Sequence, residues 1–321
     1  MTTNGPKPRL MKPCIDIVLA TYNGERFLTE QIESIQLSSR YRQLVARFII
    51  VDDGSTDSSK TLIQRLQRKD SRIEWYQNPG PHHGPLANFN YGLTLTSSEF
   101  IMLSDQDDVW HHDKIELSYQ AIKEKSGPAL LFTDKRIVDE ALNELCPSFF
   151  QLRNISRQWH HCAESLLQQN IASGCTMMFN RSLLSLALPI PSQAFMHDWW
   201  LILVARLKGE VVFLDQPLID YRQHSSNSIG ARSHSVRYLI CHFFPHLNKF
   251  KANFWRSVRQ AESLNERYQN TEVADCAYAR LQQQSYLQRL VWFCRGKVRQ
   301  HNWKGQLALL LTLLTTTKSQ F

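Results

Sequence analysis

Three aspartates, Asp105, Asp107 and Asp108, lie within four positions directly after the apolar run FIMLS at residues 100–104. Carboxylates this close repel one another unless a cation or a positively charged ligand neutralises them. Oxygen-rich sites favour Mg²⁺ or Mn²⁺, and Mg²⁺ usually shares its coordination shell with substrate phosphates. So short a pattern also occurs in ordinary solvated loops, so the cluster alone predicts either a divalent metal site or an acidic surface loop.

A second acidic pair, Asp52 and Asp53, ends the apolar run RFIIVDD at residues 47–53. A carboxylate at the end of a strand can accept hydrogen bonds from a base or a ribose. The DDGS stretch is also a good turn and helix start, because Gly54 is conformationally permissive and Ser or Asp can cap a helix. Taken singly the pair indicates a turn, and its place at a strand end is what favours a binding site.

Short apolar runs alternate with helical periodicity along residues 14–133. The predicted strands lie at residues 14–20, 47–53, 73–76, 100–104 and 129–133. The predicted helices contain Leu28, Ile32 and Ile35, then Leu62, Ile63 and Leu66, then residues 85–94, and the last begins at Lys114. This alternation predicts an α/β fold with a mostly parallel sheet covered on both faces. Ligands of such sheets bind outside the carboxyl ends of the strands, so the loops TYNGE, DDGSTD and DQDD are expected to open onto one crevice.

With these loops in place, the sequence resembles the inverting glycosyltransferases of family 2, whose nucleotide-sugar-binding fold is called GT-A. The matching segments, in the family's order, are IVLATYNGERFLTEQIESI, FIIVDDGSTDSS, PLANFNYGL, FIMLSDQDDVWHHDKI, SGCTMMFNRSLL, HDWWL and YRQHSSNSIG. The DQDDVW and YRQHSSN forms look most like the rhamnosyltransferase branch that acts in surface polysaccharide assembly. The resemblance implies a GT-A domain at residues 14–230, an α/β/α sandwich with a mostly parallel sheet. A flexible N-terminus at 1–13 precedes it, and a basic, mainly helical extension at 231–321 follows.

The resemblance also implies which residues bind the donor and the metal. The residues expected at the nucleotide and its ribose are Thr21, Tyr22, Asn23, Asp52, Asp53, Asn88 and Asp105. The metal ligands expected beside the diphosphate are Asp107, Asp108 and His224. A divalent ion there offsets the negative charge that grows on the leaving diphosphate, which makes Mg²⁺ or Mn²⁺ the expected cofactor.

On the acceptor side, the resemblance makes Asp198 of HDWWL the general base that takes the proton from the attacking hydroxyl. An aspartate at a helix start is also favoured by the helix dipole alone. The other acceptor-side candidates are Gly174, His197 and Trp199. His197 stands where the family often has Glu. Since adjacent helix positions point in different directions, at least one of Trp199 and Trp200 is expected in the core.

The predicted function is metal-dependent, inverting transfer of a sugar, with rhamnose as one possibility, from a dTDP- or UDP-sugar to a hydroxyl of a glycan or lipid-linked glycan. The predicted setting is bacterial surface polysaccharide synthesis. A sugar-phosphate nucleotidyltransferase is the first alternative. It is disfavoured because no glycine-rich loop with Arg or Lys for a triphosphate follows the first strand. A non-enzymatic nucleic-acid-binding protein is the second. It leaves the acidic clusters unexplained, so nucleic acid is not an expected partner.

The basic residues are concentrated in the C-terminal part. Residues 231–321 contain 14 Lys and Arg against 4 Asp and Glu, whereas residues 1–230 contain 23 against 25. The expected partner of this segment is therefore anionic, and an anionic membrane surface suits its interleaved aromatic and basic residues. Packing of these helices on the catalytic domain, with a solvated basic face, is the alternative. The apolar run at residues 307–314 is too short to span a bilayer.

The seven cysteines form no CxxC pair, so they predict neither a zinc ribbon nor a disulfide framework. No apolar run precedes Cys14 that could serve as a secretory signal. The expected location is the reducing cytoplasm, with peripheral association with the inner face of the cytoplasmic membrane as a possibility.

Overall fold

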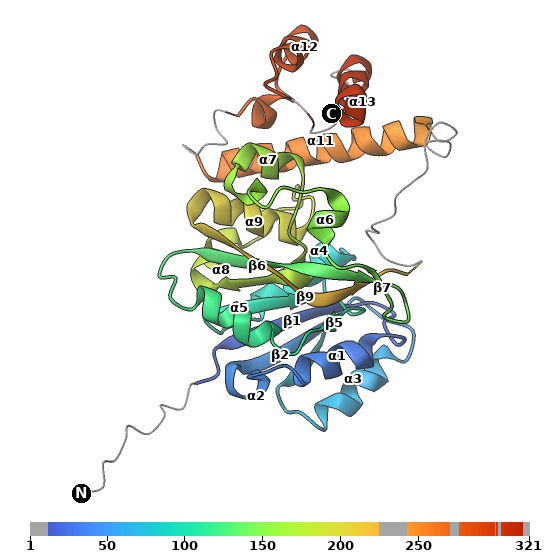
Figure 1. Ribbon diagram of the computed structural model, residues 1–321, viewed down its shortest axis with the longest axis vertical. Coiled ribbons are helices and arrows are strands. Elements are labelled where there is room, and N and C mark those ends of the chain that lie inside the picture. The colour runs from blue at the N-terminus through green and yellow to red at the C-terminus, as the bar shows by residue number, and fades with distance from the viewer. Residues whose placement is uncertain (1–11, 225–242, 270–275, 299, 301–302, 317–321) are drawn as a thin grey trace, which may run out of the picture.

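The computed structural model describes residues 12–224, 243–269, 276–298, 300 and 303–316. These residues form a nine-stranded sheet with helices on both faces and further helices stacked beyond one face (Figure 1). The predicted domain boundary at residues 230/231, the second half of the YRQHSSNSIG segment and most of the predicted N-terminal segment lie outside the described residues.

The bounds of the elements follow the alternation expected from the sequence. The strands are β1 (Ile15–Thr21), β2 (Val45–Asp52), β3 (Ile73–Gln77), β4 (Phe100–Ser104), β5 (Val109–Trp110), β6 (Ala129–Val138), β7 (Glu144–Cys146), β8 (Met177–Asn180) and β9 (Glu210–Arg222). The α-helices are α1 (Leu28–Gln36), α2 (Tyr41–Leu44), α3 (Ser59–Gln67), α4 (Pro85–Thr94), α5 (Lys114–Ile122), α6 (Phe149–Arg153), α7 (Ala163–Gln168), α8 (Arg181–Ala187), α9 (His197–Lys208), α11 (Phe243–Arg267), α12 (Tyr286–Cys294) and α13 (Trp303–Thr315). Short 3₁₀ turns are η1 (Trp159–His161), η2 (Gly174–Thr176) and η3 (Tyr278–Arg280).

The sheet has the order β3-β2-β1-β4-β8-β6-β9-β5, and β7 pairs with β6. The first four strands of this order are parallel, as predicted. Beyond β4 the sheet is mixed, because β8 runs antiparallel to both β4 and β6, and β5 runs antiparallel to β9. Of the pairs beyond β4, only β6 and β9 are parallel. The expectation of a mostly parallel sheet therefore holds for the first half and not for the second.

Alternate residues of the strands pack into two separate cores, one on each face of the sheet. Val18 and Leu103 pack with Phe89 of α4 on one face, whereas Ile17 and Met102 pack on the other. Helices α4, α8 and α9 cover the first face, and α1, α3 and α5 cover the second (Figure 1).

Helix α4 lies unusually close to the sheet. A Cβ at Gly92 would meet Val18 Cγ1 at 2.6 Å and Val51 Cγ2 at 2.9 Å, so only glycine permits this approach. Pro85 stands at the first turn of the helix, where its missing N–H costs nothing. The close packing fixes the start of α4 beside the carboxyl end of β2.

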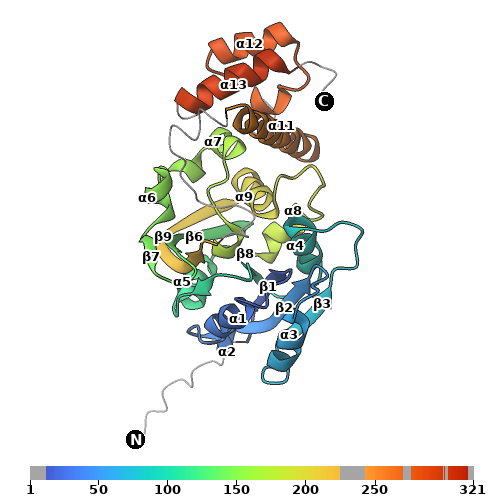
Figure 2. The same cartoon turned by 90° about the vertical axis from the view of Figure 1, so that its right-hand side faces the viewer.

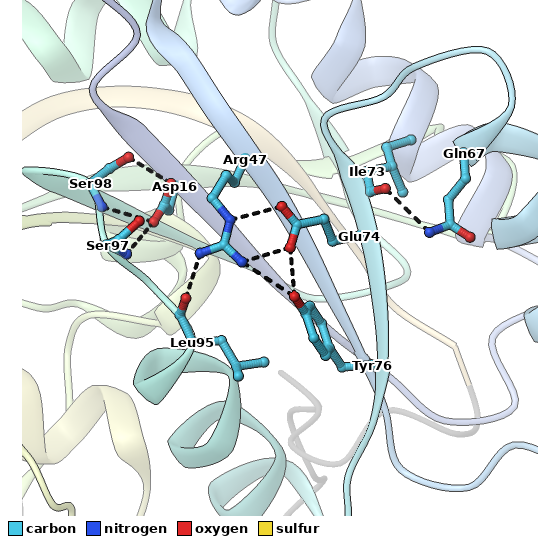
Figure 3. Close-up of polar contacts among 9 residues, drawn as sticks. All are labelled: Asp16, Arg47, Gln67, Ile73, Glu74, Tyr76, Leu95, Ser97 and Ser98. Carbon is cyan, nitrogen blue, oxygen red and sulfur yellow. Dashed lines mark hydrogen bonds and ion pairs between the residues drawn. The ribbon is translucent and has the colours of Figure 1, made fainter.

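At the amino-terminal end of the sheet, the buried Asp16 and the partly exposed Arg47 are each held by several hydrogen bonds (Figure 3). Asp16 accepts hydrogen bonds from the backbone N of Ser97 and Ser98 at 2.7 and 2.9 Å and from Ser98 Oγ at 2.6 Å. Arg47 donates to both carboxylate oxygens of Glu74, at 2.8 and 2.6 Å. These contacts tie β1 and β2 to β3 and to the turn before β4.

The C-terminal helices pack on the α4–α9 face of the molecule. Gln260 of α11 accepts a hydrogen bond from the backbone N of Phe195 at 2.7 Å. Arg267 of the same helix donates to the backbone carbonyls of residues 186–189 at the end of α8. Helices α12 and α13 lie beyond α11, at the end of the molecule opposite α1 and α3 (Figures 1 and 2). Among the described helices, none combines the length and apolar character that crossing a bilayer requires.

The three bonds to Asp16 generate a stability prediction. Asp16→Ala removes a fully buried charged acceptor and leaves two backbone N–H groups without a partner, so we expect a loss of about 2–4 kcal/mol in the free energy of unfolding. Urea unfolding measures it. The control is Asp113→Ala, whose side chain is 64% exposed and caps no backbone N–H, and it should stay within about 0.5 kcal/mol. Equal effects of the two substitutions would contradict the prediction.

Candidate active site

Hydrogen bonds join the loops after β1 and β4 at the carboxyl ends of these strands. Thr21 Oγ1 donates to Gln106 Oε1 at 2.7 Å, and the backbone N of Tyr22 donates to the same oxygen at 2.9 Å. Thr21 is buried, whereas Tyr22 is 55% exposed. The structure therefore brings these two predicted donor-site residues beside the loop of the three aspartates. Gln106 was not among the predicted site residues, because its side chain is neutral and the prediction from the DQDD stretch rested only on the carboxylates.

Two of the predicted donor-site residues shape the first two loops: Asn23 joins one loop to the other, and Asp52 closes the turn of the second. Asn23, with a φ of 48°, accepts a hydrogen bond at Oδ1 from the backbone N of Thr56 at 2.9 Å. Asp52 Oδ1 accepts from the backbone N of Ser55 at 2.9 Å and from its Oγ at 2.6 Å. The turn interpretation of the DDGS stretch therefore accounts for Asp52.

Asp53 ties the second loop to the start of α4. Its Oδ1 contacts Asn78 Nδ2 at 3.0 Å and His83 Nδ1 at 3.1 Å, and its Oδ2 accepts from the backbone N of Gly84 at 2.6 Å. Gly84 has a φ of 98°, which glycine adopts readily. Of these partners His83 is 65% exposed, so it is the one that a ligand can most easily displace.

Asn88 and Trp199 lie in the interior, where the sequence prediction did not place them. Asn88 is 2% exposed and donates from Nδ2 to the carbonyl of Val51 at 2.8 Å, which joins α4 to β2. Trp199 is 7% exposed and donates from Nε1 to the carbonyl of Leu166 at 2.6 Å. Trp200 is fully buried as well, so both tryptophans of HDWWL are core residues. Trp199, predicted as an acceptor-side residue, is therefore packed in the core, because residues 197–205 of α9 are all buried.

Asp105 lies at the centre of a group of carboxylates. Burial disfavours its charged form, and the negative charges of Asp107 and Asp198 add to this effect, so its pKa rises to about 7. The three residues come from the loop after β4 and from the first turn of α9, which are distant in the sequence. The fold has therefore gathered three of the predicted carboxylates into one electrostatic environment, which we call the acidic centre.

Asp107 and His224 are in direct contact. His224 Nε2 lies 2.8 Å from Asp107 Oδ2, and the side chains are 5% and 14% exposed. The His224 ring also lies 5.0 Å from that of Phe27. The two residues are 117 positions apart in the sequence. Both were predicted as metal ligands, and the structure places them side by side.

Asp108 is more deeply buried than its neighbours. Its Oδ1 accepts from the backbone N of Arg222 at 3.3 Å, and its Oδ2 has no hydrogen-bond partner among the described residues. Ligand atoms of Asp105, Asp108 and Cys175 all lie within 4.8 Å of one another. Burial raises the pKa of the Cys175 thiol well above its usual range, so the thiol is neutral and the carboxylate oxygens are the better ligands. An unpartnered buried carboxylate oxygen beside a second carboxylate fits a hard divalent cation such as Mg²⁺ or Mn²⁺.

Asp198 is held at the start of α9 by backbone donors. Its Oδ2 accepts from the backbone N of Gly174 at 3.1 Å, and its Oδ1 accepts from the N of Trp199 at 2.6 Å. These bonds fix the orientation of a carboxylate that remains 9% exposed. The η2 turn therefore positions the residue that was predicted as the general base.

His197 occupies the space beside Gly174. A Cβ on Gly174 would meet His197 Nε2 at 2.6 Å, so the absence of a side chain at this acceptor-side candidate makes room for the imidazole of another. The ring stacks on Phe89 with 4.0 Å between centroids, and neither of its nitrogens has a hydrogen-bond partner among the described residues. Burial lowers the pKa of His197, so the ring is uncharged at neutral pH. In this structure His197 packs beneath the turn and supports it.

Lys135 is a functional candidate that the sequence reading missed. It is 4% exposed, donates from Nζ to Ser173 Oγ at 2.6 Å, and lies 3.5 Å from the centroid of the Tyr221 ring. Its positive charge lowers the pKa of Asp105 and Asp108, against the larger effect of their burial. The sequence feature that could have identified Lys135 is its position just beyond the apolar run ALLFT, at the end of a predicted strand, where ligand-binding residues are expected.

The acidic centre thus combines carboxylates fit for a divalent cation, a buried ammonium group and one carboxylate held apart on a helix start. Such an arrangement can bind an anionic ligand through a metal and remove a proton from a second ligand.

The sequence matches a family model described as glycosyl transferase family 2 over residues 16–185. This range runs from the second residue of β1 into α8, and it contains Asp105, Asp107 and Asp108 but neither Asp198 nor His224.

Two relatives bear names of specific glycosyltransferases. The chain is 26% identical, over 66% of its length and 74% of the other, to a dTDP-rhamnosyl transferase, RfbG, of Shigella flexneri. It is 35% identical to a GalNAc(5)-diNAcBac-PP-undecaprenol beta-1,3-glucosyltransferase of Campylobacter jejuni over 30% of each chain. The chain thus spans less than a third of the length of this second relative.

A solved structure confirms the fold. A mannosyltransferase from Pyrobaculum calidifontis, in complex with GDP-Man and Mn²⁺, superposes with a TM-score of 0.54 at 13% identity, over 95% of this chain and 88% of that one. The predicted GT-A class, with a helical C-terminal part, is therefore confirmed.

The contact between Gly174 and His197 generates a prediction. Gly174→Ala forces a Cβ against the buried imidazole, so we expect a loss of about 1–3 kcal/mol in the free energy of unfolding. In a His197→Ala background the same substitution should cost less than about 0.5 kcal/mol, because the opposing atoms are gone. Urea unfolding of the four proteins measures the coupling.

The matched control is Gly127→Ala. No heavy atom lies within 4 Å of the position that a Cβ would take at Gly127, so this change should be nearly neutral. Equal costs of Gly174→Ala in the two backgrounds would show that His197 is not the obstacle.

Proposed function

Because the chain belongs to glycosyl transferase family 2 and is therefore a glycosyltransferase, we propose that it transfers a sugar from a nucleoside-diphosphate sugar to a glycan hydroxyl, with inversion at the anomeric carbon. The observation that supports this proposal most directly is the meeting of Asp105, Asp107 and Asp198 in one acidic centre. One part of this centre faces the diphosphate of the donor, and Asp198 faces the acceptor.

The donor nucleotide lies against the loops after β1 and β2. The exposed ring of Tyr22 offers an apolar face to the base. Asp53 accepts a hydrogen bond from the base when His83 moves aside, since His83 is its most exposed partner. Thr21 and Asp105 line the path to the ribose, while Asn23 and Asp52 act by shaping the loops. The first donor to test is dTDP-rhamnose, because the RfbG relative is named for it.

A divalent metal, Mg²⁺ or Mn²⁺, is held by Asp107 and His224, with Asp105 alongside and Asp108 behind them. When bound, the ion supplies positive charge that stabilises the departing diphosphate. Most of these candidate ligands are carboxylate oxygens, which suit Mg²⁺ and Mn²⁺. The neighbouring Cys175 thiol is neutral, so it offers no thiolate that would favour a softer metal.

Asp198 accepts the proton of the acceptor hydroxyl as that oxygen attacks the sugar. The Gly174 and Trp199 backbone N–H groups hold its carboxylate in one orientation. Because the neighbouring His197 ring is uncharged, it does not neutralise the carboxylate. Lys135 acts as a positioning residue. Its bond to Ser173 anchors the turn whose next residue, Gly174, holds Asp198.

The acceptor is a glycan, and we place it on a lipid carrier at the cytoplasmic face of a membrane, in the synthesis of a bacterial surface polysaccharide. The Campylobacter jejuni relative is named for an undecaprenol-linked glycan, which supports an acceptor of this class. The basic helices 243–316 fit an anionic surface at which such a lipid is presented.

The reaction is tested first with purified full-length protein, a panel of nucleotide sugars and Mn²⁺. Nucleotide-dependent thermal stabilisation and release of a nucleoside diphosphate are the expected results. Release of pyrophosphate instead would assign the protein to nucleotidyl transfer, and the absence of both stabilisation and release would contradict the proposal.

Asp198→Asn should reduce release of nucleoside diphosphate by about 10²–10⁴-fold, because only proton removal in the transition state is lost. Donor affinity, measured by titration calorimetry, should stay within about twofold, because the substitution changes no contact with the donor in the ground state. Asp113→Asn, on an exposed aspartate, serves as the control and should match the unmodified protein. A collapse of donor affinity in Asp198→Asn would place this residue in the donor site instead.

Asp107→Ala should abolish the part of the donor's thermal stabilisation that depends on Mn²⁺, since the carboxylate in contact with His224 is removed. Thermal unfolding with donor, in Mn²⁺ and in chelator, measures this part directly. His224→Ala should act in the same direction, and Asp113→Ala should leave the metal-dependent shift intact. An unchanged metal-dependent shift in Asp107→Ala would remove Asp107 from the coordination shell.

A further inference from the structure

Helices α12 and α13 form the end of the molecule that lies beyond α11 (Figures 1 and 2). We call this part, residues 276–298 and 303–316, the C-terminal tip. The two helices contact each other, and α13 also packs on α11. Trp255 of α11 donates from Nε1 to Thr316 Oγ1 at 3.1 Å, which holds the end of α13 in place. The tip is therefore a packed part of the fold with an outer surface of its own.

That outer surface is apolar. The described residues include ten large hydrophobic side chains that are exposed, and five of these belong to the tip. They are Tyr286, Leu287, Val291, Leu307 and Leu314. Leu287 is 72% exposed, and only Leu37, at the opposite end of the molecule, exceeds it. Exposed apolar residues scattered singly need no explanation, but a cluster on adjacent elements marks an interaction surface.

The spacing of these residues places them on one stripe of each helix. Leu287, Val291 and the exposed Cys294 recur at intervals of four and three along α12. Leu307 and Leu314 are seven apart on α13, with the half-buried Leu310 and Leu311 between them. Positions three, four and seven apart share a helix face. Each helix therefore presents a continuous apolar stripe outward.

The charge of the tip has one sign. The C-terminal tip contains five Lys and Arg and no Asp or Glu. Arg295 and Lys297, which follow directly on α12, are exposed. Leucine, valine and tyrosine next to basic residues, with no acidic residue, are typical of helices that lie in the interface of an anionic bilayer.

We propose that the C-terminal tip docks on an anionic lipid surface, with the stripes of α12 and α13 inserted at the level of the headgroups and Arg295 and Lys297 beside the lipid phosphates. Two amphipathic stripes on adjacent helices let the tip lie on a membrane without crossing it. The inference concerns a surface away from the acidic centre, so it stands or fails separately from the proposed reaction.

Charge decides among the occupants that an apolar surface could bind. A second copy of the tip would place two basic surfaces against each other, which like-charge repulsion disfavours. A nucleic acid would pair with the basic residues but would leave the leucines and the valine in water. An anionic bilayer satisfies both features, because it offers phosphates at its surface and hydrocarbon directly below.

The experiment is co-sedimentation of the full-length protein with vesicles. One set consists of equal parts of phosphatidylcholine and phosphatidylglycerol, and the other of phosphatidylcholine alone. We expect binding to the first set, at least about tenfold weaker binding to the second, and partial loss of binding as salt is raised. Leu287→Gln with Val291→Gln should weaken binding to the anionic vesicles by about tenfold or more.

Matched controls exist for both features. Leu37→Gln changes a leucine that is 73% exposed, against 72% for Leu287, at the other end of the molecule, and should bind as the unmodified protein does. Arg295→Gln with Lys297→Gln should weaken binding, whereas Arg68→Gln with Lys69→Gln, an exposed basic pair after α3, should not. All these side chains are exposed, so unchanged thermal unfolding is expected and confirms that the variants fold.

Several results would overturn the proposal. Folded protein that stays in the supernatant with the anionic vesicles would do so, as would equal losses in the Leu37→Gln and the Leu287→Gln, Val291→Gln proteins. Salt-sensitive binding of RNA with no vesicle binding would assign the basic residues to nucleic acid. A dimer in solution that Leu287→Gln, Val291→Gln dissociates, again with no vesicle binding, would assign the tip to self-association.

Discussion

Mutual repulsion of carboxylates at the carboxyl end of the sheet is the constraint on which the rest of the site depends. Asp105, Asp107 and Asp108 leave one strand end, and Asp198 joins them from α9. The fold holds them together by placing cations around them. The positive charge of Lys135 lowers the pKa of Asp105 and of Asp108. Lys114 is buried, and burial lowers the pKa of its ammonium group to about 8. The negative charge of Asp108 opposes this effect, so the two groups lie close to each other. These cations offset the repulsion only in part, since burial still raises the pKa of both aspartates. A further cation beside these carboxylates would favour their charged forms.

The two ends of the sheet treat buried charge in opposite ways. At the amino end, Asp16 has three hydrogen bonds and Arg47 a bidentate partner, so these charges stabilise the strands and are not available to a ligand. At the carboxyl end, Asp108 Oδ2 and both nitrogens of His197 are buried without partners among the described residues. The buried Asp108 oxygen without a partner lies at the end of the sheet where the predicted donor-site loops also lie, so this is the end that can take a ligand.

The first half of the fold was readable from the sequence because it repeats one local unit. Each strand there is a short apolar run, each helix has a clear periodicity, and α4 spans residues 85–94 as predicted. The second half was not readable in this way, because β8 enters the sheet antiparallel and is short. For the site, charge patterns drew attention to Asp105, Asp107 and Asp108, and the resemblance to family 2 added Asp198 and His224, which the fold places beside them. Packing decided the rest. Trp199, Asn88 and Gly174 are placed by what lies against them, and Lys135 by rings and a hydroxyl from distant segments. Such contacts leave no trace in local sequence.

The basic C-terminal helices show why a formal charge count and a surface charge differ. Arg289 is 1% exposed and donates to the backbone carbonyls of Leu281 and Gln282, and Arg267 caps the end of α8. These two cations hold helices in place. Packing on the catalytic part therefore uses only some of the basic residues of this segment, and it does not exclude contact of the others with an anionic surface. The same stretch of sequence can serve both purposes, because some of its cations are turned inward and fix the helices while others remain exposed. The sequence total cannot separate the two groups, because a guanidinium that caps carbonyls and one that meets solvent count equally in it. Only exposed cations, such as Arg295 and Lys297, are available to an anionic partner.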